Sequence, residues 1–131
     1  MMLSKEQILA VSDLKTEEVS VPEWGGSVVV RMMTGADRDS FESSMVTVNA
    51  DGTRSPNMVN MRAKLVALTM VGEDGNLLFS VDEIGHLAGK SAAALERVFN
   101  VAQRLNGMGV GSVDDAAKNS EPGLSESSTS A

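Results

Sequence analysis

The chain has 131 residues, no cysteine and a formal net charge of −7 at pH 7. This length suffices for one domain with a modest core, and the lack of cysteine excludes disulfides and thiolate chemistry. An acidic chain is a poor match for nucleic acid, because neutralising phosphates requires a basic stripe. No apolar run approaches the ~20 residues that span a bilayer, so we expect neither nucleic acid nor a membrane as a partner.

The first predicted element is a short helix over Ser4–Val11. Ser4 can cap its free amides, while Gln7 can reach back to complete a capping box. Ile8 and Val11 share one face at helical spacing, so we expect both to point inward.

A β-hairpin is predicted next. Apolar residues alternate with polar ones over Thr16–Val21, and Ser27–Met33 is a second run of strand length. The Glu-Trp-Gly-Gly segment between them supplies the glycines that a tight turn favours. Because a lone hairpin is marginal in water, it should pack on a helix or on another chain.

Thr34 is predicted to open a second helix, whose apolar stripe is formed by Phe41, Met45 and Val48. Residues 49–57 are predicted to be a loop, because they contain Asp-Gly and Ser-Pro and offer no apolar anchor.

A third helix, over Met58–Val71 with Asn57 as its cap, is predicted to have two apolar faces. Val59, Val66 and Met70 make one of them. A helix of this kind is either buried between layers or shared with a neighbour, and burial within the monomer is the commoner outcome. The other face consists of Met58, Met61, Leu65 and Leu68.

The longest predicted helix, Ser91–Asn106, is the element against which the others should pack. A brief helix precedes it, with a capping box from Ser80 to Glu83. Ser91 is the expected cap, and Gly107 stands where a left-handed residue would end the helix. The apolar stripe consists of Leu95, Val98, Phe99, Ala102 and Leu105.

These elements predict an α+β fold: a small, helix-rich domain over residues 1–106, with one β-hairpin packed on an amphipathic helix. Residues 107–131 read as an acidic tail rich in serine and glycine. We expect residues 120–131 to be disordered, because they can bury too little apolar surface to offset their ordering entropy.

The segment from Gly85 to Ser91, GHLAGKS, ends like a phosphate-binding loop. It has three residues between its glycines where that loop needs four, and it follows a predicted helix instead of a strand. His86 is the only histidine, so one chain cannot form a site with two histidines. We therefore expect no catalytic residue, no cofactor and no metal site.

Nine methionines and a tryptophan in the hairpin turn raise the possibility of a surface that binds another protein. The alternative is that the methionines fill the core and that the tryptophan folds back over the sheet. The candidate contacts with a partner are Trp24, Val59, Val66, Met70 and Val101.

Four stretches, taken in order, resemble the tail assembly chaperones of bacteriophages with long, non-contractile tails. They are LSKEQILAVSDLKTEEVSVPEWGG, TGADRDSFE, RAKLVALTMVGEDGNLLF and KSAAALERVFNVAQRLNG. The resemblance covers about residues 3–119. It implies a protein without enzymatic activity that acts in the host cytoplasm, binds the tape measure protein, helps tail-tube subunits assemble around it and is absent from the virion.

The resemblance also implies a longer form made by ribosomal frameshifting, through which the tail-tube protein would be bound. Lys118-Asn119 can be encoded AAA AAC, which after a codon ending in A gives the slippery heptamer A-AAA-AAC. This pair is the candidate boundary, and the gene sequence tests it.

We further expect a homo-oligomer, formed through the hairpin edge or through the second face of the helix predicted over Met58–Val71. A structural head-to-tail connector or tail completion protein is the alternative function.

Overall fold

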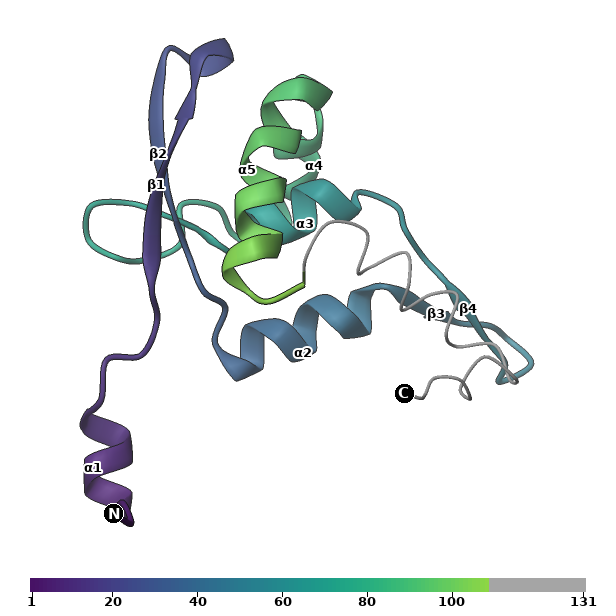
Figure 1. The fold of residues 1–131 in the computed structure, drawn as a ribbon. Coiled ribbons are helices and arrows are strands. Elements are labelled where there is room, and N and C mark those ends of the chain that lie inside the picture. Colours follow the sequence, from purple (N-terminus) through teal and green to yellow (C-terminus); the bar gives the residue numbers. More distant parts are fainter. Residues whose placement is uncertain (109–131) are drawn as a thin grey trace, which may run out of the picture.

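The computed structural model describes residues 1–108 (Figure 1). Helices and strands alternate irregularly along this part of the chain, and two single turns of 3-10 helix, η1 and η2, lie between them. In order, the elements are α1 (Lys5–Ala10), β1 (Thr16–Val21), η1 (Pro22–Trp24), β2 (Gly26–Arg31), α2 (Gly35–Ser44), β3 (Val46–Val48), β4 (Arg54–Pro56), α3 (Met61–Ala67), β5 (Met70–Val71), η2 (Val81–Glu83), α4 (Ile84–Ala88) and α5 (Ala92–Leu105).

The main sheet has three antiparallel strands in the order β1–β2–β5. The β1–β2 hairpin turns through η1 and Gly25, whose φ of +77° lies in the left-handed region that favours glycine. Helix α5 packs along β1 and β2 (Figure 1). The predicted α+β class, with a hairpin against an amphipathic helix, is confirmed.

Helix α5 has the predicted boundaries and the predicted inward face. Ser91 Oγ accepts a hydrogen bond from the Ala94 amide at 3.0 Å, and Gly107 adopts φ +72° just beyond the helix. The stripe lies in the core, with Leu105 only partly buried at its end. The fully buried residues around it come from both strands of the hairpin and from α3, namely Val21, Val30, Leu65 and Val66.

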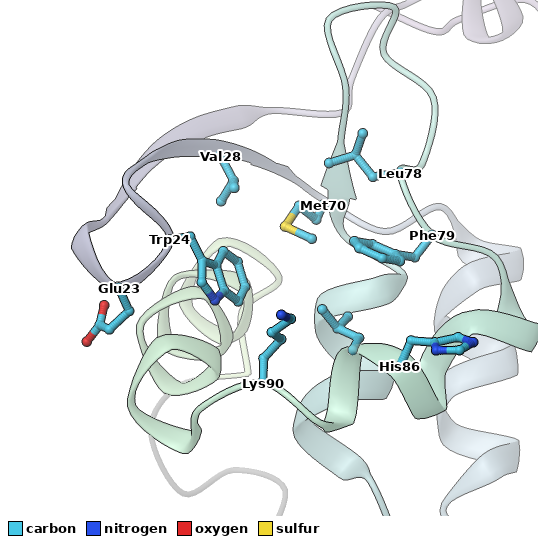
Figure 2. Close-up of a pocket in the computed structure, with 9 residues that line it drawn as sticks. Glu23, Trp24, Val28, Met70, Leu78, Phe79, His86 and Lys90 are labelled. Atoms are coloured by element: carbon cyan, nitrogen blue, oxygen red, sulfur yellow. The ribbon is translucent and has the colours of Figure 1, made fainter.

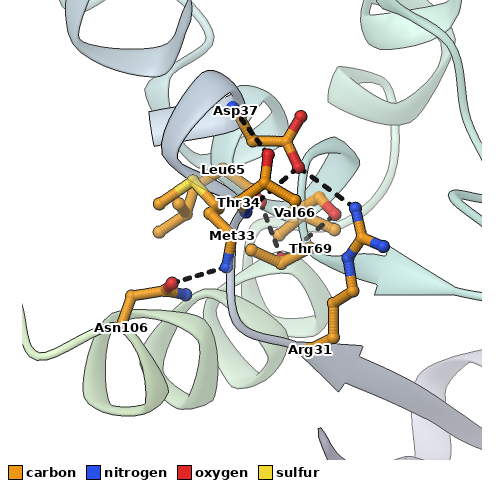
Figure 3. Close-up of polar contacts among 8 residues, drawn as sticks. All are labelled: Arg31, Met33, Thr34, Asp37, Leu65, Val66, Thr69 and Asn106. Atoms are coloured by element: carbon orange, nitrogen blue, oxygen red, sulfur yellow. Dashed lines mark hydrogen bonds and ion pairs between the residues drawn. The ribbon is translucent and has the colours of Figure 1, made fainter. Parts of the chain in front are cut away.

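Asn106 ties the end of α5 to the connection between β2 and α2 (Figure 3). Its Oδ1 accepts a hydrogen bond from the Met33 amide at 2.7 Å, while its Nδ2 donates to the Ala102 carbonyl at 2.8 Å. Arg38 Nη1 also donates to the Asn106 carbonyl, at 3.3 Å. The helix end and the start of α2 are therefore held at a fixed separation.

Thr69 joins the end of α3 to the sheet. Its buried hydroxyl donates to the Leu65 carbonyl at 2.7 Å, and its own carbonyl accepts from the Arg31 amide at 2.8 Å. The Arg31 guanidinium then pairs with Asp37 at 3.1 Å, in the first turn of α2 (Figure 3). Two helices and a strand thus meet at one polar cluster.

The segment predicted as a loop, residues 49–57, instead forms much of a second hairpin. Val46 pairs with Pro56 and Val48 with Arg54, around a turn in which Gly52 has φ +87°. Val48 was expected on the stripe of α2, but α2 ends at Ser44 and Val48 is 65% exposed. The Asp-Gly pair marked a hairpin turn and not an open loop, as it often does between short strands.

The helix predicted over Met58–Val71 is also wrong in extent, because α3 covers only Met61–Ala67. Asn60 begins it in the left-handed conformation, with φ 56°, and Asn57 does not cap it. Asn57 Oδ1 instead accepts from the Val59 amide at 3.1 Å, which forms a separate turn. Beyond α3, β5 joins the edge of the sheet beside β2, because pairing there outweighs helix propensity.

Helix α1 has its predicted capping box, in which Ser4 and Gln7 bond each other's backbone amides. The predicted inward face is wrong, because Ile8 and Val11 are both exposed. No residue of α1 is buried. The local signal for a helix was correct, but it carried no information on whether the body of the protein covers that helix.

Replacing each of two valines by alanine tests which of them lies in the core and which at the surface. Val98 is 0% exposed and Val59 is 68% exposed. We expect Val98→Ala to lower the free energy of unfolding by about 2 kcal/mol, because it removes two buried methyl groups and leaves a cavity. Val59→Ala should change it by less than ~0.5 kcal/mol. Urea unfolding of dilute protein measures both values, and equal effects would contradict the assigned core.

Candidate interaction surface

The described residues contain no metal-binding cluster of three or more histidine, cysteine or acidic side chains. The segment GHLAGKS forms α4 and the start of α5, as its helical setting predicted. The Lys90 amide donates to the Leu87 carbonyl at 3.1 Å, so it closes a helix end and does not point to a phosphate site. In this part of the chain no helix has the length and hydropathy of a membrane span.

Exposed large apolar side chains gather on projecting parts of the molecule. One group lies on the N-terminal arm, which we define as residues 1–11; another lies on the β3–β4 hairpin and the segment that follows it; a third lies before and within η2. The residues of these groups are Met1, Met2, Leu3, Ile8, Leu9 and Val11; Val46, Val48, Met58 and Val59; and Leu78 and Val81.

The N-terminal arm stands apart from the body of the protein (Figure 1). The rest of the described chain covers little of the apolar surface of the arm. The side chain of Leu9, for example, is 77% exposed. A six-residue helix is too short to be stable alone in water, even when it is well capped. The arm therefore needs another surface to hold it as a helix.

The β3–β4 hairpin projects from the far end of α2 (Figure 1). All three residues of β3 are exposed, and Asn49 and Thr53 hold the turn with a side-chain hydrogen bond of 2.9 Å. An isolated two-stranded hairpin is marginally stable in water. This hairpin too presents apolar surface that the described part of the chain, residues 1–108, leaves exposed.

A pocket of about 520 Å³ opens beside the tip of the β1–β2 hairpin (Figure 2). Its apolar walls come from the hairpin, from β5, from the segment before η2 and from α4. The Lys90 side chain points in between Trp24 and Met70, while His86 lies to one side (Figure 2). The volume lies within the ~300–1,000 Å³ typical of small binding sites. The lining residues are Glu23, Trp24, Val28, Met70, Leu78, Phe79, His86, Leu87 and Lys90.

Two ion pairs fasten α5 to the hairpin, one at the pocket and the other near the start of β1. Arg97 Nε donates to both oxygens of Glu23, at 2.9 and 3.1 Å, and Arg104 Nη2 donates to Glu17 at 2.7 Å. These hydrogen bonds lower the pKa of both carboxyl groups. A lowered carboxyl pKa adds stability at neutral pH that is lost as the pH falls through the folded-state pKa. The pairs are exposed, so the gain is small.

The five candidate contacts do not form one surface. Val59 is exposed, Trp24 is partly buried at the pocket, and Val101 is partly buried against the core. Val66 is buried in the core, so the prediction that it reaches a partner is wrong for the folded chain. Met70 is also largely buried, but it lines the pocket, so its contact with a partner stays a prediction. Val66 packs in the core because α3 contacts both α5 and α4. For Val66 the alternative of burial within the monomer is confirmed.

Sequence reasoning missed the N-terminal arm, Leu78 and the exposed strand β3 as candidate contacts. A signal for the arm was present, because its apolar residues fall all around a helix of only two turns and cannot all face one core. No local signal could have placed Leu78 at a pocket whose other walls come from distant parts of the chain.

The predicted disorder of residues 120–131 and the candidate frameshift boundary at Lys118 and Asn119 lie outside the described residues. Within the stretch assigned to the tail, 107–131, Met108 is buried and its amide donates to the Gln103 carbonyl at 2.7 Å. The folded body therefore extends at least to Met108.

The fold and the surface define a small α+β protein whose exposed apolar groups sit on projecting elements, as is typical of proteins that bind other proteins. Residues 5–119 match the family described as phage tail assembly chaperone, and the chain belongs to this family. The solved structure of the bacteriophage HK97 tail assembly chaperone has a similar fold, with a TM-score of 0.55 and 21% sequence identity. The similarity covers 76% of this chain and 90% of that one. No curated protein matches the chain.

Replacement of one arginine tests the assignment of the ion pairs. Arg104→Gln should raise the pKa of the Glu17 carboxyl toward its ordinary value, because the charged donor is lost. NMR titration of the side chain measures this change. Arg97→Gln is the matched control, since it should raise the pKa of Glu23 and leave that of Glu17 in place. A Glu17 titration that does not respond to Arg104→Gln would contradict the pairing.

Proposed function

We propose that this tail assembly chaperone binds the tape measure protein, keeps it soluble and promotes assembly of the tail tube around it. The observation that carries the proposal is the apolar surface on the arm and on the β3–β4 hairpin, in a member of this family. We take the tape measure protein to be a long helical protein with apolar stretches. Such a protein aggregates before its partners bind, unless those stretches are covered. Exposed apolar groups of the chaperone can cover them.

Weak contacts repeated over many copies produce strong coating that remains reversible. The chaperone therefore acts as a homo-oligomer in the host cytoplasm and leaves before the virion is complete. A frameshifted longer form, with its boundary at Lys118-Asn119, binds the tail-tube protein. The chaperone performs no catalysis and uses no cofactor.

Co-expression with the tape measure protein tests the coating directly. The chaperone should raise the soluble fraction of the tape measure protein several-fold and be retained in a pull-down. Val46→Asp/Val48→Asp, on β3, should reduce both effects, because it places charge on the exposed apolar surface. Thr47→Asp, between them on the same exposed strand, is the matched control and should act like the wild type. A tape measure protein that stays insoluble with the wild-type chaperone would contradict the proposal.

Mass spectrometry of purified virions separates the proposed role from that of a head-to-tail connector. A chaperone should be absent from the particles at a depth that detects the tape measure protein. Stoichiometric recovery of the chain in virions would favour the connector.

A further inference from the structure

The N-terminal arm and the pocket beside Trp24 complement each other in apolar character and in charge. The arm carries exposed apolar side chains on a capped helix, whereas the pocket has apolar walls that residues 1–108 leave open. Glu6 lies in the first turn of α1, and the Lys90 side chain points in among the residues that line the pocket (Figure 2). Neither forms an ion pair within residues 1–108, whereas Glu23 of the pocket is already paired with Arg97.

The arm and the pocket lie at opposite ends of β1 (Figure 1 and Figure 2). The arm precedes Thr16, and the pocket starts at Glu23, beyond Val21. Lys15 is anchored, because its carbonyl accepts a hydrogen bond from the Met32 amide at 2.9 Å. Residues 12–14 are the free link between the arm and Lys15, so Val11 lies at most about 14 Å from Lys15. The Trp24 end of the pocket lies beyond the whole of β1, which is about 20 Å long, so Ile8 and Leu9 do not reach Trp24 of their own chain.

We infer that the arm of one copy docks in the pocket of a second copy, with Ile8 and Leu9 against the apolar walls and Glu6 near Lys90. This contact rests on the self-association that forms part of the proposed function. Each docked copy still offers a free arm at one end and a free pocket at the other. The contact is therefore heterologous, and repeating it builds a ring or an open filament.

Docking also explains how a six-residue helix without buried residues can persist. Its apolar face is covered by the next copy, so packing between chains supplies the stability that helix propensity cannot. The arm is then ordered only in the assembled state.

Trp24 reports on the contact, because it is the only tryptophan in the chain and it lines the pocket. In the purified full-length chain, rising concentration should shift its emission to shorter wavelength while light scattering shows a growing mass. Leu9→Asp should abolish the shift and weaken association at least about tenfold, since it removes an apolar side chain from the interface. Leu9 is exposed, so this variant should fold normally.

A mixing experiment tests the polarity of the contact. Leu9→Asp disables the arm and leaves the pocket, while Leu78→Asp disables the pocket and leaves the arm; both side chains are exposed. Each variant alone should be a monomer, and an equimolar mixture should form a dimer and nothing larger. Val48→Asp, on the β3–β4 hairpin, is the control and should associate like the wild type.

Charge exchange tests the orientation of the docked arm. Lys90→Glu should weaken association, and addition of Glu6→Lys should restore it. Wild-type growth that stops at two copies, or undiminished association of Leu9→Asp, would overturn the inference. Because these measurements use the chaperone alone, they leave the proposed binding of the tape measure protein to its own test.

Discussion

The packing of α5 against the β1–β2 hairpin is the interaction on which the rest of the structure depends. The valines of the two strands and the apolar stripe of the helix form one core, and α3 completes it from the other side. Asn106 and the two arginine pairs then fix where the helix ends and how it lies along the strand. The helices, strands and turns outside this contact are held by fewer apolar contacts or by none.

The limited size of the core explains the shape of the protein. A chain of this length can build only one modest core, and this one builds it from the main sheet, α3, α4 and α5, with Phe41 from α2. The arm and the β3–β4 hairpin lie outside it and keep their apolar side chains exposed. A protein that masks an aggregation-prone partner needs such surface, and it needs a core that stays folded while the surface is bound or free.

The sequence predicted those elements whose periodicity and caps agree. Helix α5, strand β1 and the capping boxes of α1 and η2 were all found, because Ser4, Ser80 and Ser91 mark starts that local chemistry decides. The failures have a common cause. Val66 and Met70 were read as a face of one long helix, but whether a residue joins a helix, a sheet edge or the core is decided by distant contacts.

We propose that partners order the arm and the β3–β4 hairpin, whereas the chain itself orders the core. Amide hydrogen exchange of α1 and α5, followed from dilute monomer to the assembled chaperone, tests it most directly. We expect the amides of α5 to be protected throughout and those of α1 to become protected only on assembly. Strong protection of α1 in the dilute monomer would contradict it.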